Sequence, residues 1–193
     1  MDSSLPRALH DAMSTRLGDG WLTGEGRRLY GGDDSRRWAM PSAVALPRTP
    51  DDVVALVRAC REHRVPLVAR GAGTGTTGAA VPTQGGVVVS FARMDRILEL
   101  RAADRCVVVE PGVLNGGLQQ TLAPYGLFWP PDPSSADLCS VGGNLATNAG
   151  GPRAVKYGTA RDNVLGLVAV TGTGELIRCG GAYTKDATGY DLT

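Results

Sequence analysis

Apolar and polar positions follow the period of an amphipathic helix most clearly between residues 49 and 64. The apolar residues recur at the i, i+3, i+4 and i+7 spacing of one helix face, at Val53, Leu56, Val57 and Cys60. Thr49 can cap this helix and Pro50 suits its first turn. Apolar runs at 42–47 and 66–70 flank it and predict strands. The segment therefore predicts a β-α-β unit whose two strands run parallel.

The remainder of the chain is predicted to be rich in strands. We expect residues 1–39 to form a helical leader that ends in a polar turn at 30–38. Strands are expected at 86–91, 94–100 and 105–112, with a hairpin over 164–179, and a short helix at 115–126.

The segment RGAGTGTTGAAVP, residues 70–82, formally contains the G-x-G-x-x-G pattern of a dinucleotide-binding turn. That motif requires a following helix, but Pro82 and the Gly85-Gly86 pair leave no room for one before the next strand. We therefore expect a nest of backbone N–H groups around an anion, with hydroxyl donors from the threonines. No lysine follows as in a P-loop, and a glycine turn without any ligand remains an alternative.

Composition narrows the class of protein. The net charge of +1 provides no basis for binding nucleic acid or an anionic membrane. The longest apolar runs are of strand length, and the N-terminus lacks the apolar core of a signal peptide. The four cysteines are scattered and show no metal-binding spacing, so we expect core thiols of a cytoplasmic protein without a metal.

Glycine is the outlier in composition, at 27 of 193 residues, about twice the usual ~7%. A second glycine-rich segment, residues 139–163, carries small polar groups as well. Two such segments could line opposite ends of one long ligand that bears phosphates and a planar heterocycle, because backbone amides suit a pyrophosphate.

Five motifs now occur in order: RGAGTGTTGAAVP, VVVEPG, PPDPSS, SVGGNLATNAGGPRAVKYG and KDATGYDLT. Together they resemble the FAD-binding domain of the vanillyl-alcohol oxidase and p-cresol methylhydroxylase (PCMH) superfamily. Within it, the chain is most similar to the flavin subunit of glycolate oxidase and to the D-lactate and D-2-hydroxyglutarate dehydrogenases. The resemblance implies an α+β, PCMH-type FAD-binding domain over 40–193. A small parallel β-α-β subdomain, about 40–100, would pack against a mixed or antiparallel sheet subdomain, about 101–193, with FAD between them.

The resemblance also implies the residues that bind FAD. The pyrophosphate loop comprises Arg70, Gly71, Ala72, Gly73, Thr74, Gly75 and Thr76. The flavin and ribityl region comprises Ser134, Ser135, Ala136, Asp137, Leu138, Cys139, Ser140, Gly142 and Gly143. A further cofactor loop comprises Thr147, Asn148, Ala149, Gly150 and Gly151, and the strand around Val168 meets the adenine end.

For the parent protein, the resemblance implies oxidation of a small D-2-hydroxy acid by hydride transfer to flavin N5, with a further electron-acceptor partner possible. The chain stops before the segment that completes the FAD site in the family, so we expect a C-terminally truncated piece that lacks the substrate domain and is inactive alone. No catalytic base is visible: Asp132, Asp137 and Lys156 are better explained as loop charges, and His63 as a residue at a helix end.

Two other functions stay open at this point. One is a flavoenzyme of the same fold with different chemistry, such as aromatic-alcohol oxidation or ether-lipid synthesis. The other is a non-catalytic nucleotide-binding module. Bound FAD is expected to be non-covalent, because the first loop contains neither His nor Cys and Cys139 is expected to pack beneath the second.

Overall fold

The computed structural model describes residues 5–183, 190, 192 and 193. They form two compact units, each described separately below: unit 1 contains residues 1–94 and 170–175, and unit 2 contains 95–169 and 176–193. The motif KDATGYDLT lies largely outside the described residues.

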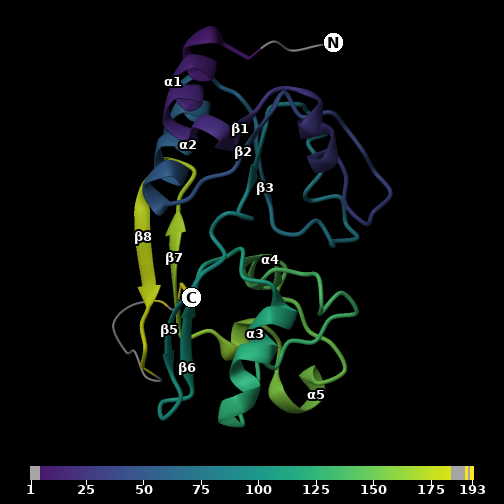
Figure 1. The fold of residues 1–193 in the computed structure, drawn as a ribbon, viewed down its shortest axis with the longest axis vertical. Helices are drawn as coiled ribbons and strands as arrows, with labels where there is room; N and C mark the ends of the chain where they lie inside the picture. The colour runs from purple at the N-terminus through teal and green to yellow at the C-terminus, as the bar shows by residue number, and fades with distance from the viewer. Residues whose placement is uncertain (1–4, 184–189, 191) are drawn as a thin grey trace. The chain divides into compact units, whose positions relative to one another are not determined.

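Unit 1 is built on a four-stranded sheet in the order β1-β2-β4-β3. Figure 1 labels β1, β2 and β3 of this sheet. Its strands are β1 (Trp21–Leu22), β2 (Ala43–Ala45), β3 (Leu67–Arg70) and β4 (Val87–Ser90). β2 and β3 both pair with β4 in parallel, whereas β1 pairs with β2 antiparallel. The predicted parallel β-α-β unit is therefore confirmed, and the third parallel strand lies between the first two.

Helix α2 (Pro50–Glu62) connects β2 to β3 and shows the predicted N-terminal chemistry. The Thr49 hydroxyl accepts from the Asp52 N–H, and the Asp52 carboxylate accepts from the Thr49 N–H, so both ends of a capping box are present. The apolar face of α2 packs in one core cluster with helix α1 (Arg7–Leu17) and the sheet. This cluster contains Leu9, Met13, Trp21, Ala43, Ala45, Leu56, Cys60, Val87 and Val89.

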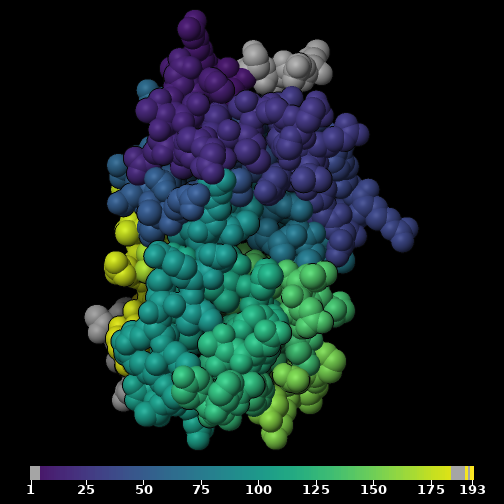
Figure 2. All heavy atoms as spheres, viewed as in Figure 1, coloured from purple at the N-terminus to yellow at the C-terminus, as the bar shows by residue number. Residues whose placement is uncertain are grey.

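The N-terminal leader differs from the predicted helical segment. After α1 and a 3₁₀ turn (Gly18–Gly20), the chain forms the edge strand β1, and a second 3₁₀ helix follows at Glu25–Tyr30. Trp21 pairs with Ala45 across the sheet and is buried, so the leader belongs to the core of unit 1. The two-residue strand is too short to show an alternating pattern, which explains why the sequence did not predict it. In the space-filling view, the purple and dark-blue N-terminal residues form much of the visible surface of this unit (Figure 2).

Unit 2 combines two antiparallel elements with short helices. β5 (Ile97–Arg101) pairs antiparallel with β6 (Cys106–Val109) through an irregular register, and β7 (Gly166–Val170) pairs with β8 (Leu176–Gly180). The helices are α3 (Asn115–Leu122), α4 (Val141–Ala146) and α5 (Ala154–Tyr157), with 3₁₀ turns at Ala123–Tyr125 and Arg161–Asn163. Val113, Leu118, Leu122, Trp129 and Val141 form the buried core. The strand pair and the hairpin were predicted, but α4 and α5 were not.

Within the described residues, none of the helices combines the length and the apolar character that crossing a membrane would require.

Candidate functional site

The first glycine-rich segment is the connection between β3 and β4, residues 71–86. It leaves β3 at the carboxyl end of the parallel strands, where open α/β sheets bind their ligands. No helix occurs in this connection, as the sequence predicted.

The first part of this connection, residues 71–79, is called here the donor loop. Its main-chain N–H groups donate no hydrogen bond to any residue that the structure describes, and neither do the hydroxyls of Thr74, Thr76 and Thr77. Backbone donors are normally paired or solvated, so a row of free ones suits an anion with many acceptor oxygens. This loop therefore has the chemistry that a pyrophosphate requires.

Gly73 and Arg70 give the donor loop its shape. Gly73 has a φ of +79°, and a Cβ at this position would meet the guanidinium of Arg70. The Arg70 side chain donates to the Gly32 carbonyl and lies over the Tyr30 ring. Gly75, by contrast, has no positive φ, and a Cβ there would meet nothing within 4 Å. A side chain at residue 75 would therefore extend into open space, and the steric requirement for glycine lies at Gly73.

The polar segment 30–38 braces the donor loop, a role that the sequence did not indicate. The Asp33 carboxylate accepts from the Ala80 N–H at 3.4 Å and from the Ser35 N–H at 3.0 Å. Burial opposes ionisation of Asp33, but these hydrogen bonds and the charge of Arg70 outweigh it, so the pKa of its carboxyl lies below its ordinary value. Burial in turn lowers the pKa of Arg70, which nevertheless stays charged at neutral pH.

In unit 2, residues 134–140 form a tight turn that leads into α4. The N–H groups of Ala136, Leu138 and Cys139 are bonded within the turn, whereas those of Ser134, Ser135 and Asp137 donate to none of the described residues. Leu138 is exposed, and Gly116 lies close beneath Asp137, where a Cβ would be 3.3 Å from the Asp137 Cα.

The start of α4 is closed to a ligand's acceptors. Ser140 caps the helix by accepting from the Gly143 N–H at 3.2 Å, and the Gly142 N–H donates to the Pro111 carbonyl. A Cβ on Gly142 would lie 2.6 Å from the Pro111 Cβ. Here glycine allows two backbones to approach each other, and its N–H groups are already used within the fold.

The loop after α4 places the predicted residues 147–151. Asn148 adopts a left-handed φ of +47°, and its side-chain oxygen accepts from the Arg161 N–H. The Thr147 hydroxyl donates to the Gly143 carbonyl, and the Ala149 N–H donates to the Asn144 carbonyl. Only Gly150 and Gly151 keep N–H groups that donate to no described residue.

Gly151 joins this loop to the proline-rich segment before it. A Cβ on Gly151 would lie 2.1 Å from the Asp132 carbonyl oxygen, and the Asp132 carboxylate accepts from the Arg153 N–H and pairs with its side chain at 3.4 Å. Asp132, two residues before the turn at 134–140, thus contacts the loop that carries the free donors of Gly150 and Gly151. This contact also supports the interpretation of Asp132 as a loop-ordering charge.

A buried pair of asparagine side chains joins α3 to α4, and the sequence analysis did not predict this contact. Asn115 and Asn144 are 1% and 3% exposed, and the Asn144 Nδ2 donates to the Asn115 Oδ1 at 3.3 Å. The Asn115 Nδ2 has no partner among the described residues. Both asparagines lie on helices that flank the cofactor segments, so their orientation fixes how α3 meets α4.

The remaining predicted residues carry less information. Val168 lies in β7 and is about half exposed. Cys139 is 4% exposed, and its thiol donates to the Ala136 carbonyl at 3.9 Å.

The two histidines have structural contacts: His10 accepts from the Trp21 indole N–H, and His63 caps the end of α2. The four cysteines are free, and no cluster of three metal-ligating side chains occurs among the described residues.

Comparison with known proteins adds to this geometry. A family model described as an FAD binding domain matches residues 41–180. The glycolate oxidase subunit GlcD of Bacillus subtilis is 44% identical over 87% of this chain and 36% of its own length. The D-2-hydroxyglutarate dehydrogenase of Stutzerimonas stutzeri is 42% identical over 96% of this chain and 40% of its own length. The chain thus spans little more than a third of the length of these curated relatives.

Among solved structures, p-cresol methylhydroxylase with substrate bound is similar with a TM-score of 0.76 and 21% identity, over 96% of this chain and 37% of that one. This similarity confirms the predicted α+β fold of the superfamily. The family match confirms FAD as the cofactor.

Proposed function

The chain belongs to the family of FAD-binding domains, and from this premise we propose that it is the FAD-binding part of a flavin-dependent oxidoreductase that oxidises a small D-2-hydroxy acid. The observation that carries the proposal is the donor loop. Its unpartnered N–H groups, its hydroxyls and the neighbouring Arg70 match the acceptor oxygens and the charge of the FAD pyrophosphate.

The residues of unit 2 would serve the flavin portion. The free donors of Ser134, Ser135, Asp137, Gly150 and Gly151 suit polar atoms of a heterocycle or of the ribityl chain. The start of α4 has no free donors, so it suits van der Waals contact rather than hydrogen bonds with the cofactor. When bound, FAD supplies the redox chemistry by accepting a hydride at N5 from the carbon that carries the substrate hydroxyl. The chain itself binds and orients the cofactor and shields it from water.

The substrate class rests on the named relatives. The two reported above act, by their names, on glycolate and on D-2-hydroxyglutarate, which share a hydroxyl on the carbon next to a carboxylate. We therefore assign a small 2-hydroxy acid to the whole protein, with a separate electron acceptor and a cytoplasmic location.

We further propose that FAD is held without a covalent bond. The donor loop contains neither His nor Cys, and the Cys139 thiol is buried and directed to the Ala136 carbonyl. A cysteine that bonds to flavin needs an accessible thiolate, which this environment does not favour.

Two measurements test the function. Flavin fluorescence, titrated with this chain, should show saturable FAD binding that ADP weakens by competition. Dye reduction with glycolate, D-lactate and D-2-hydroxyglutarate should be absent with the chain alone and present with the protein extended to the length of its relatives. No FAD binding would contradict the cofactor role, and an extended protein that binds FAD but oxidises none of the three acids would contradict the substrate class.

A further inference from the structure

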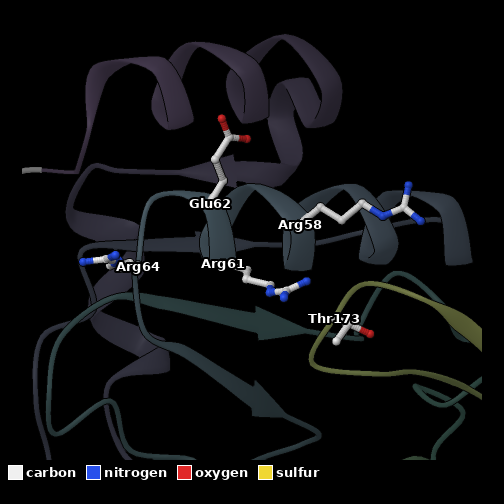
Figure 3. A pocket seen from close by; sticks show the side chains of 5 residues that line it. All are labelled: Arg58, Arg61, Glu62, Arg64 and Thr173. Carbon is white, nitrogen blue, oxygen red and sulfur yellow. The ribbon is translucent and has the colours of Figure 1, made fainter.

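An arginine-lined pocket lies in unit 1, at the C-terminal end of α2. It is an open surface depression of about 550 Å³, a volume within the range of small-molecule sites, and its exposed lining residues are Arg58, Arg61, Glu62, Arg64 and Thr173 (Figure 3). Four of them come from α2 and the residues that follow it, and Thr173 comes from the turn between β7 and β8. All belong to the same compact unit.

The three arginines of this pocket differ from the seven arginines of the chain that form ion pairs. Arg7, Arg16, Arg48, Arg93, Arg96, Arg101 and Arg153 each pair with a carboxylate. Arg58, Arg61 and Arg64 pair with no carboxylate within the part of the chain that the structure describes, although Glu62 lies beside them in sequence. In Figure 3 the Glu62 carboxylate points away from Thr173, whereas the Arg61 guanidinium extends toward it. The pocket is therefore left with an uncompensated positive charge.

Helix electrostatics explain only part of this arrangement. A cation in the last turn of a helix is stabilised by the helix dipole, which accounts for Arg61. Arg58 lies a turn earlier and is fixed by a different contact: its Nε donates to the Gly174 carbonyl at 2.9 Å. Gly174 is buried with a φ of +78°, and a Cβ there would lie 2.4 Å from the Arg58 Cγ. The turn is thus shaped to receive this side chain.

This contact leaves the two terminal nitrogens of Arg58 free to bind a ligand. Arg61 offers a whole guanidinium fork, and the Thr173 hydroxyl, 2.7 Å from that of Thr171, adds a donor from the opposite element. A single guanidinium fork satisfies a planar carboxylate. Two forks and a hydroxyl from different elements instead suit a tetrahedral oxyanion, whose oxygens accept hydrogen bonds from several directions.

We propose that this pocket is a second anion site, distinct from the donor loop, that binds the phosphate group of a small molecule. Arg58 is the pre-positioned contact, Arg61 closes on the anion from α2, and Thr173 contacts it from the turn. Arg64 points the other way in Figure 3 and contributes only its charge.

The test is a titration of the ¹⁵N-labelled chain, saturated with FAD, with inorganic phosphate at constant ionic strength. We expect saturable shifts of the Thr173 amide and the Arg58 Nε–H signals. Arg61→Gln should weaken binding about tenfold or more, because it removes charge-assisted hydrogen bonds. Arg58→Lys, which keeps the charge but loses the fork, should weaken it as well. Arg105→Gln removes an exposed arginine that has no ion pair, and it should leave binding unchanged.

Several outcomes would overturn the proposal. One is the absence of saturable shifts at Thr173 and Arg58, and another is an equal loss in Arg61→Gln and Arg105→Gln. A signal that appears only without FAD would place the anion in the donor loop instead. Stronger shifts at Thr173 with succinate would assign the pocket to carboxylates, and stronger shifts with polyglutamate would assign it to an acidic protein segment.

Discussion

The two glycine-rich regions of this chain use glycine for different physical reasons. In the donor loop, residues 71–79, the N–H groups are free and Gly73 supplies a left-handed conformation. In the second region, residues 140–151, most N–H groups are bonded, and Gly142 and Gly151 allow a close approach to Pro111 and Asp132. Glycine content alone therefore does not identify an anion nest. The deciding property is whether the backbone N–H groups are free or already hydrogen-bonded within the fold. The following predictions test that distinction, beginning with the largest expected effect.

Gly151→Ala should destabilise the fold, because its Cβ would overlap the Asp132 carbonyl, which is backbone and cannot rotate away. The expected loss in the free energy of unfolding is about 1–3 kcal/mol. Gly117→Ala is the matched control, since a Cβ there meets nothing within 4 Å and alanine favours a helix by up to about 1 kcal/mol. Urea denaturation measures both. Equal stability of the two variants would show that the close approach is unimportant.

Gly73→Ala should weaken FAD binding about tenfold or more while the fold persists. Alanine at a φ of +79° is strained by about 1–2 kcal/mol, and its Cβ would displace the Arg70 guanidinium. Gly75→Ala provides the comparison, because that position has no left-handed φ and no close neighbour. Fluorescence titration should therefore show a smaller loss for Gly75→Ala than for Gly73→Ala. The reverse order would mean that the loop rearranges when FAD binds.

Glu110 pairs with Arg96 in unit 2, next to Pro111, and gives the stability of this unit a pH dependence. Hydrogen bonds from Arg96 lower the pKa of the buried Glu110 carboxyl, although burial opposes them. Because the folded pKa is lower than the unfolded one, the pair stabilises the fold above the ordinary pKa of Glu and loses this contribution as pH falls through the lowered pKa.

Glu110→Gln should therefore lower the thermal midpoint at neutral pH, and the difference from wild type should shrink in acid. FAD affinity should change little, because the hydrogen bonds of the Glu110 carboxylate go to Arg96 and not to the cofactor segments. Melting curves from neutral pH down to about pH 3 check this. A constant difference across that range would exclude the ion pair as the cause.

Cys139→Ala should have the smallest effect on the cofactor. Flavin colour should leave the acid-precipitated pellet equally in wild type and variant, with FAD affinity changed less than about threefold, since the thiol is buried and turned toward Ala136. Colour that remains in the wild-type pellet and disappears in the variant would demonstrate a covalent bond.

The sequence predicted the elements whose signals are local. The α2 helix carries a full apolar stripe and a capping box, and the absence of a helix after the donor loop follows from Pro82 and Gly85-Gly86. The short helix α4 was missed because VGGNLA has two glycines, which are poor helix formers, and its stability comes from the Ser140 cap and from packing on Pro111.

Contacts between distant segments could not be predicted from one sequence. Asp33 accepts from the Ala80 N–H, 47 residues later and just after the donor loop. Asn115 meets Asn144 across 29 residues, and Arg58 bonds to Gly174 across 116. Each depends on how the chain folds in three dimensions, and none has a spacing that marks it in the sequence. These contacts nevertheless hold the candidate sites in shape.

Hydrogen exchange of the backbone amides, measured with and without FAD, tests the central claim most directly. The amides of residues 71–79 should exchange fast in the free chain and become protected when FAD binds, because their N–H groups then donate to the pyrophosphate. The amides of 141–144 should be slow in both states, since they are bonded within the fold. FAD binding that leaves residues 71–79 unprotected would contradict the assignment of the donor loop as the pyrophosphate site.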